Sequence, residues 1–305
     1  EILHNDHMMF LDRALETQRT ALLTAMADAV SECRTAADQA AEGPVLLLAV
    51  PGSGKTTALI HRLGYLIFCR GVAPEHILTV TYTVSATKDM AARFAQVFGA
   101  DLAGRLEFRT INGLSARIIR YYEKTKGRTA FALITSERKL SSLVGDLCQK
   151  ATGEFPTEST VKSLRTAITY IKNKQLGPEA IEKYPLDDLP VGKIYQEYCA
   201  ALRSYGWMDF DDQMVYAARI LRKYPEILGA FQDRYRYLCV DEAQDTSRIQ
   251  HTILRLLAGQ IRKRAGLVLA DVAARHVAHA AIFPQGIQTH KGLPAVGAAH
   301  QLGQQ

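Results

Sequence analysis

The chain has 305 residues and a net charge of +6. Hydrophobic residues make up 48% of it and charged residues 22%, a composition that excludes a disordered or fibrous protein and indicates a globular one. No apolar run approaches the roughly 20 residues that span a bilayer, and the N-terminus lacks a basic segment followed by an apolar core, so we expect neither a membrane anchor nor a secretory signal. The cysteines form no Cys-x-x-Cys pair, which favours reduced thiols in a cytoplasmic protein over disulfides or zinc.

The N-terminal third of the chain alternates between helix and strand signals. The predicted elements are a helix over 11–41, a strand over 45–50, a helix over 55–68, a strand over 77–82 and a helix over 85–98, which Gly99 ends. Strands and helices that alternate at this spacing imply a parallel sheet with right-handed crossovers.

A glycine-rich turn connects the first predicted strand to the helix that follows it. The turn reads Ala49-Val50-Pro51-Gly52-Ser53-Gly54-Lys55-Thr56-Thr57. Backbone N–H groups in such a turn cradle phosphate oxygens, and the helix N-terminus adds partial positive charge. Lys55 would reach the β- and γ-phosphates, and the Thr56 hydroxyl would bind Mg²⁺. We therefore predict a nucleotide site here. The alternative, a turn that binds nothing, does not explain why Lys and Thr follow Gly54 directly.

The middle of the chain, from about residue 114 to residue 231, has helical periodicity and few strand signals. Asp209 directly precedes the last predicted helix and is a favoured N-cap residue, while Asp211 and Asp212 suit the positive end of that helix. A second metal site made by these three acids is the alternative. The predicted helices cover 140–150, 161–172, 191–205 and 210–223.

A further apolar strand, predicted over 235–240, ends in acids. Asp241 would hold Mg²⁺, and Glu242 would act as the general base that deprotonates the attacking water. The alternative is that these acids cap a helix that starts near Thr246. Lys55 and Asp241 must meet around one metal ion although they lie far apart in the sequence. The helical segment between them is therefore best explained as a domain inserted into the sheet domain.

The last part of the chain differs in composition. From residue 260 to residue 305 it has no Ser, Cys, Met, Asn, Tyr or Trp, and Asp271 is its only acid. Residues 266–271 form an apolar run suited to a further strand, and periodicity is weak after residue 281. We interpret this segment as an atypical tail, with disorder and a cloning or reading-frame artefact as the alternatives.

With these motifs placed, the chain resembles the UvrD/Rep-like superfamily 1 DNA helicases. The resemblance implies an α/β fold of the P-loop NTPase (RecA-like) type, with a parallel sheet and an inserted all-helical subdomain. The matching segments, in order, are the glycine-rich turn, Ile77–Thr83 with Ala86, Arg109–Leu114, Met208–Asp212 and Asp241–Thr246. The implied domains are residues 1–112 and 233–258 for the two parts of the RecA-like ATP-binding domain, 113–232 for the helical insert and 259–305 for the tail.

The resemblance also implies partners and residue roles. The family moves along single-stranded DNA and opens DNA duplex junctions with ATP and Mg²⁺, and the basic net charge permits such a polyanionic partner. Gln244 would link the γ-phosphate site to the DNA-binding surface. Hydroxyl, amide and aromatic groups suit sequence-independent DNA binding. The residues that would face the DNA are Thr81, Tyr82, Thr83, Thr110 and Asn112. For Tyr82, a core aromatic at the strand end is the alternative.

The sequence departs from the family pattern near both ends. The adenine-reading glutamine is best matched by Gln18, although Gln18 lies further from Lys55 than the family spacing; Gln39 is nearer but lacks the flanking pattern. After the acidic motif, we find neither the family's next motif nor its second RecA-like domain, which carries arginines that contact the γ-phosphate. The resemblance therefore implies a motor truncated before its second domain, with slow hydrolysis when alone.

These observations together predict an ATP-dependent DNA helicase, in which Lys55, Glu242 and Gln244 act in catalysis. Two alternatives stay open. One is a P-loop nucleotide-binding module without helicase activity, and the other is a P-loop ATPase that acts on a substrate other than DNA.

Overall fold

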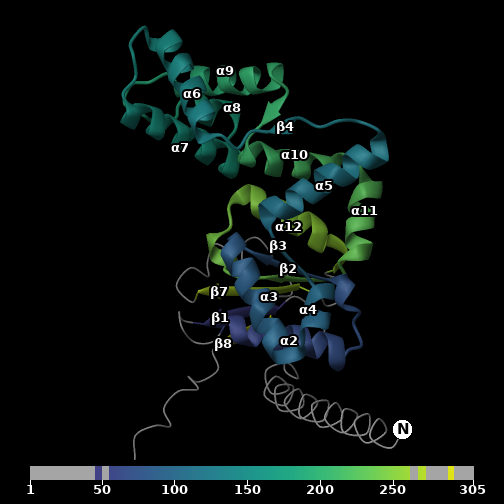
Figure 1. Cartoon of the computed structure of the whole chain (residues 1–305). Helices are drawn as coiled ribbons and strands as arrows, with labels where there is room; N and C mark the ends of the chain where they lie inside the picture. The colour runs from purple at the N-terminus through teal and green to yellow at the C-terminus, as the bar shows by residue number, and fades with distance from the viewer. Residues whose placement is uncertain (1–44, 50–54, 262–266, 273–287, 292–305) are drawn as a thin grey trace, which may run out of the picture. The chain divides into compact units, whose positions relative to one another are not determined.

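The computed structural model describes residues 45–49, 55–261, 267–272 and 288–291 (Figure 1). They form two compact units, which we call the sheet unit and the helical unit. The sheet unit contains the described residues up to Thr110, Gln232–Asp245 and those from Ala258 onward, and the helical unit contains Ile111–Phe231 and Thr246–Leu257. The predicted boundaries of the insert, 113–232, follow the sequence motifs and stay a prediction.

The sheet unit is built on a six-stranded sheet in which all the paired strands are parallel, in the order β3-β2-β6-β7-β1-β8. Every residue of β2 is buried, as expected for a parallel strand covered on both faces. The predicted α/β class with a parallel sheet is confirmed. The strands are β1 (Val45–Ala49), β2 (Ile77–Thr81), β3 (Glu107–Thr110), β6 (Tyr237–Val240), β7 (Leu267–Val272) and β8 (Gln288–Lys291).

Two of these strands lie in the segment that the composition marks as an atypical tail. β7 contains the apolar run that suits a strand, whereas β8 reads Gln-Thr-His-Lys, a polar sequence in which no strand is predicted. Parallel pairing with β1, from Gln288 opposite Val45 to Lys291 opposite Leu48, defines β8. The predicted helix over 11–41 and the other tail residues beyond Ile261 lie outside the described residues.

The helices α2, α3 and α4 of the sheet unit lie against its strands (Figure 1). α3 packs against β2 and β3, and α2 packs against α3 and β7. Buried leucines from α2 meet Phe94 and Phe98 from α3 in one core cluster. Gly99 ends α3 with φ 93°, a conformation that glycine adopts without strain, as the sequence predicts. The helical elements are α2 (Lys55–Phe68), η1 (Pro74–His76), α3 (Val84–Phe98), α4 (Ala100–Arg105) and η2 (Ala243–Asp245).

Gly64 in α2 allows the close approach of α3. A Cβ atom at this position would lie 2.3 Å from Cζ of the buried Phe98 ring. Although Gly→Ala in a helix is usually favourable, we expect Gly64→Ala to lower the free energy of unfolding by about 1–3 kcal/mol through this overlap. Thermal unfolding followed by circular dichroism measures the change. Gly104→Ala in α4 is the matched control, because a Cβ there meets nothing within 4 Å; an equal or larger loss in the control would contradict the packing argument.

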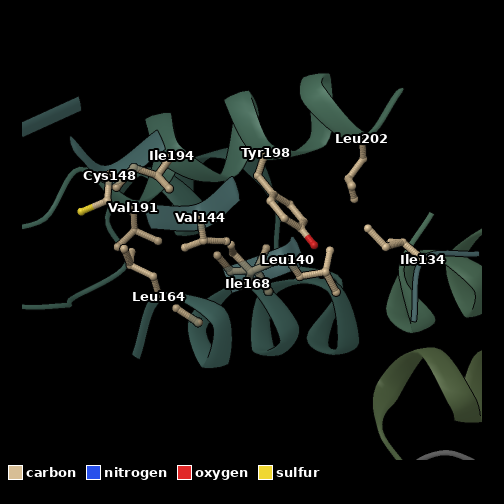
Figure 2. Packing of buried hydrophobic residues seen from close by; sticks show 12 residues of the cluster. Ile134, Leu140, Val144, Cys148, Leu164, Ile168, Val191, Ile194, Tyr198 and Leu202 are labelled. Atoms are coloured by element: carbon tan, nitrogen blue, oxygen red, sulfur yellow. The ribbon is translucent and has the colours of Figure 1, made fainter. Parts of the chain in front are cut away.

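The helical unit has its own apolar core, formed mainly by α6, α7 and α9. Figure 2 shows Leu140 and Val144 from α6, Leu164 from α7, and Ile194 and Tyr198 from α9 directed toward one another. A two-residue parallel ribbon, β4 (Ala132–Leu133) with β5 (Trp207–Met208), lies in the same unit. The helices are α5 (Ile111–Lys126), α6 (Glu137–Thr152), α7 (Glu158–Lys174), α8 (Pro178–Glu182), α9 (Val191–Ser204), α10 (Phe210–Lys223), α11 (Pro225–Arg234) and α12 (Arg248–Ile261), the last two of which end in the sheet unit.

A buried ionic cluster joins three helices of this unit. Lys172 of α7 donates to Asp209 Oδ2 at 2.6 Å and lies 2.9 Å from Asp212 Oδ1, and the Tyr198 hydroxyl donates to Asp209 Oδ2 at 2.8 Å. Asp209 also caps α10: its side chain accepts from the backbone N–H of Asp212, and the Asp212 side chain accepts from that of Asp209. Asp211 accepts from Thr169 at 2.8 Å. The capping interpretation of these acids is therefore confirmed, and the Lys172 ammonium faces two of the carboxylates.

None of the helices in the described part of the chain combines the length and the apolar content needed to span a bilayer.

Candidate functional site

The polar residues predicted to act on nucleotide follow strands of the parallel sheet. Because all its strands run the same way, their carboxyl ends meet at one edge. α2 begins at Lys55, shortly after β1, and Asp241 directly follows β6. One strand, β7, lies between β6 and β1. Neighbouring strands are spaced about 4.8 Å apart, so the carboxyl ends of β6 and β1 are about 10 Å apart, a distance that a phosphate with its metal ion can bridge.

Lys55 is the first residue of α2, and its side chain is buried. The pKa of the Asp241 carboxyl is raised, and the positive charge of Lys55 opposes this rise. Thr56 is half-buried and Thr57 is exposed. Ala49 ends β1, which places the start of the predicted phosphate turn at the carboxyl edge of the sheet. The other predicted nucleotide residues, Val50, Pro51, Gly52, Ser53, Gly54 and Gln18, lie outside the described residues.

Asp241 is held in place by backbone hydrogen bonds. Its own N–H donates to the Val80 carbonyl at 2.9 Å, which extends the pairing of β6 with β2, and the N–H of Glu242 donates to Asp241 Oδ1 at 3.1 Å. Burial and the neighbouring charge of Glu242 raise the pKa of the Asp241 carboxyl. A buried carboxylate is a hard oxygen ligand of the kind that Mg²⁺ prefers, and binding a cation would relieve the cost of its charge.

Glu242 has a strained backbone. Its φ is 50°, in the left-handed region that non-glycine residues avoid, and such outliers persist where the surrounding structure holds them. Its half-buried side chain accepts a hydrogen bond from Nε2 of Gln244, in the short helix η2. Gln244 Oε1 is buried without a hydrogen-bond partner among the described residues. An oriented carboxylate and an unused acceptor beside it suit a site that positions water. The hydrogen bond from Gln244 to Glu242 is not among the features predicted from the sequence, although the two-residue spacing is a signal for it.

The raised pKa of Asp241 predicts a pH-dependent effect of its removal. Because the folded-state pKa lies above the unfolded value, the ionised carboxylate costs stability at higher pH, and this cost disappears as pH falls below the ordinary range of an aspartate. We expect Asp241→Asn to be more stable than the unsubstituted chain at neutral pH without nucleotide, and the difference to shrink on acidification. Urea unfolding at several pH values measures it, with exposed Asp233→Asn as control; a loss of stability at neutral pH would contradict the argument.

Three of the predicted DNA-facing residues lie at the end of β2 and in the turn that follows, and they differ in their exposure to solvent. Thr81 is buried, and its hydroxyl bonds the Thr83 carbonyl at 3.1 Å and the Thr87 hydroxyl at 2.6 Å, so it shapes the turn rather than presenting its side chain to solvent. Thr83 is exposed and caps α3 by accepting from the Ala86 N–H at 3.0 Å. Tyr82 is 58% exposed. The alternative that Tyr82 is a core aromatic is therefore wrong, while its contact with DNA stays a prediction.

The remaining two predicted DNA-facing residues lie on either side of the boundary between the units. Thr110 ends β3 in the sheet unit and is half-buried. Asn112 lies in the first turn of α5 in the helical unit, and its Oδ1 is buried without a hydrogen-bond partner among the described residues. Their part in binding DNA stays a prediction.

Comparison with known proteins adds a finding independent of this geometry. A family model described as the UvrD/REP helicase N-terminal domain matches residues 30–271. The ATP-dependent DNA helicase PcrA of Leuconostoc citreum is 31% identical over 238 residues, 76% of this chain and 31% of that protein. PcrA of Bacillus subtilis (strain 168) is 31% identical over 220 residues, 71% of this chain and 29% of that protein. The chain thus spans less than a third of the length of these relatives.

Proposed function

Because the chain belongs to the UvrD/REP helicase N-terminal domain family, we propose that it supplies the ATP-binding part of an ATP-dependent DNA helicase. The observation that carries the proposal is the position of Lys55, Asp241 and Glu242 at the carboxyl edge of one parallel sheet, separated by a single strand. The relatives' names give the same activity for longer proteins, of which this chain matches less than a third, so the activity of the whole motor belongs to this proposal.

Each residue near that edge receives a role from its chemistry. Residues 49–57 and the helix N-terminus would hold the phosphates of ATP, with Lys55 at the β- and γ-phosphates. Thr56 and Asp241 would hold Mg²⁺, which when bound neutralises phosphate charge. Glu242 would accept a proton from the attacking water, and Gln244 would keep that carboxylate aimed. Gln18 would contact adenine.

The second half of the proposal concerns DNA. Tyr82 offers an exposed aromatic ring beside the hydroxyl of Thr83, a combination that stacks on bases and binds phosphates without reading sequence. Thr110 and Asn112 would add polar contacts, and Thr81 would support the turn. Arginines that contact the γ-phosphate in the transition state would come from a second motor domain, so we expect slow hydrolysis by this chain alone.

DNA-stimulated ATP hydrolysis tests the proposal. We expect ATP turnover by this chain to rise when a single-stranded oligonucleotide is added. Tyr82→Ala should weaken binding of a labelled oligonucleotide by about tenfold, since stacking contributes about 1–3 kcal/mol per base. Fluorescence anisotropy measures the affinity. Tyr205→Ala is the control, because Tyr205 is equally exposed, at 58%, and lies in the helical unit.

Two results would favour the alternatives. In the first, ATP turnover does not rise when DNA is added, and Tyr82→Ala leaves oligonucleotide binding unchanged. This result would indicate a P-loop ATPase with another substrate. ATP binding without measurable turnover, with or without DNA, would indicate a nucleotide-binding module that needs a further domain for its chemistry.

A further inference from the structure

The helical unit contains a large pocket that none of the proposed roles uses. It has a volume of about 580 Å³ and lies between α7, α9, α10 and the first turn of α12. All of its lining residues belong to the helical unit. This volume falls in the range of pockets that hold small molecules, and a pocket with convergent polar groups is the usual place to look for a ligand site.

Three arginines dominate the charge of this pocket. Arg203 comes from the last turn of α9, and Arg219 and Arg222 lie one turn apart on α10. All three are exposed, and among the described residues none of them forms an ion pair. Guanidinium groups present paired N–H donors that match phosphate and carboxylate oxygens. Three unpaired guanidinium groups at one pocket therefore form a binding surface for an anion.

The acidic residue that lines the pocket is already paired with a lysine. The carboxylate of Asp212 also lines the pocket, but it lies 2.9 Å from Nζ of Lys172, which is buried and bonded to Asp209 as well. The single positive charge of Lys172 is shared by Asp209 and Asp212, so this pairing offsets part of the charge that would otherwise oppose an anion. It also keeps Lys172 from serving as a ligand itself, so the arginines are left as the groups able to bind.

The rest of the lining combines apolar and aromatic side chains with the polar groups of Gln175, Gln196 and Cys199. Ile171, Val215 and Ile249 contribute apolar surface, and the rings of Tyr195 and Tyr216 lie among them. The Arg219 guanidinium lies over the Tyr216 ring, 5.9 Å from its centroid. Arginine planes and tyrosine rings are surfaces on which a planar ring stacks. The pocket therefore places arginines that can bind an anion next to apolar and aromatic side chains that can contact a flat, less polar group.

We propose that this pocket binds a free phosphorylated small molecule of nucleotide size, with its phosphate on Arg219 and Arg222 and its ring against the tyrosines. The site is separate from the nucleotide site at the sheet edge, since no residue of the sheet unit lines it. A phosphate at the end of a DNA strand shares this chemistry, and the test distinguishes the two sources.

The test measures binding of AMP and of pyrophosphate by isothermal titration calorimetry, using the whole chain with Lys55→Ala to weaken the site at the sheet edge. We expect saturable binding of AMP with one site per chain. Adding Arg219→Ala and Arg222→Ala should raise its Kd by about tenfold or more, because each charge-assisted hydrogen bond contributes substantially. Arg138→Ala, which removes an exposed arginine of α6 outside the pocket, should leave the Kd unchanged.

A lysine pair, Arg219→Lys with Arg222→Lys, keeps the charge but loses the paired donors, and should fall between the two extremes. Circular dichroism checks that each variant is folded. The proposal is overturned if neither AMP nor pyrophosphate binds, or if AMP binding is unaffected by the double alanine variant. It is also overturned if a 5′-phosphorylated oligonucleotide binds through these arginines while AMP does not.

Discussion

Glu242→Gln is expected to lower ATP hydrolysis by about 10²–10⁴-fold while leaving ATP binding intact. Glutamine has the size of glutamate, but its amide cannot take a proton from water. The Glu242 side chain is half-buried at the edge of the sheet, and Gln244 holds it by a hydrogen bond that the glutamine variant can still accept. The loss should therefore appear in the chemical step rather than in folding or in nucleotide affinity.

A single-turnover assay with labelled ATP gives the dynamic range that a slow enzyme requires. Binding is measured in parallel with a fluorescent ATP analogue. Glu158→Gln, which neutralises an exposed glutamate at the start of α7, is the matched control and should hydrolyse ATP at the unsubstituted rate. Equal rates for Glu242→Gln and the unsubstituted chain would exclude Glu242 as the general base.

Lys172→Met is expected to destabilise the helical unit by about 3–5 kcal/mol, the usual cost of removing one partner from a buried ionic cluster. Lys172 is 3% exposed and contacts both Asp209 and Asp212. Burial lowers the pKa of this lysine, but the two carboxylates raise it by more, so the net pKa is raised. The stabilisation by Lys172 is therefore fully present below the ordinary lysine pKa and is lost only as pH rises through the higher folded value.

The variant leaves two carboxylates without their cation. Burial already raises the pKa of Asp212, with Lys172 opposing the rise, so in the variant Asp212 should take up a proton more readily. The destabilisation should therefore be largest at neutral pH and should decline as pH falls. Adding Asp212→Asn to Lys172→Met should recover part of the lost stability, because it removes one uncompensated charge.

Urea unfolding followed by tryptophan fluorescence measures these changes in the relevant unit, since Trp207 is the chain's only tryptophan and lies in the helical unit. Lys193→Met, at an exposed position of α9, is the control and should change stability by no more than about 0.5 kcal/mol. A similarly small effect of Lys172→Met would show that the cluster contributes little.

Local signals explain which parts of the fold could be predicted from the sequence. The helix over 210–223 matches its prediction, because Asp209 and the helical periodicity both act over neighbouring residues. The helix over 55–68 matches as well, because the glycine-rich sequence before Lys55 predicts where the helix begins. β8 was not predictable, since its four residues are polar and the strand is defined by the pairing of its backbone with β1.

Features that depend on distant residues could not be predicted. Lys172 looks like an ordinary surface lysine in a helical pattern, and only the fold brings Asp209 and Asp212 to it. The positive φ of Glu242 depends on how the chain leaves β6, which no residue type in the acidic motif signals. The three arginines of the pocket in the helical unit come from two helices, α9 and α10, so they do not form a continuous basic run in the sequence.

Equilibrium binding of ATP with Mg²⁺ to the unsubstituted chain and to Lys55→Ala tests the central claim most directly. That claim places one nucleotide site where Lys55 and Asp241 meet at the carboxyl edge of the sheet. Calorimetry should show saturable, Mg²⁺-dependent binding by the unsubstituted chain and a Kd at least about tenfold higher for Lys55→Ala, which loses a charged contact to phosphate. Equal affinities for the two chains would contradict the claim and would place any nucleotide elsewhere.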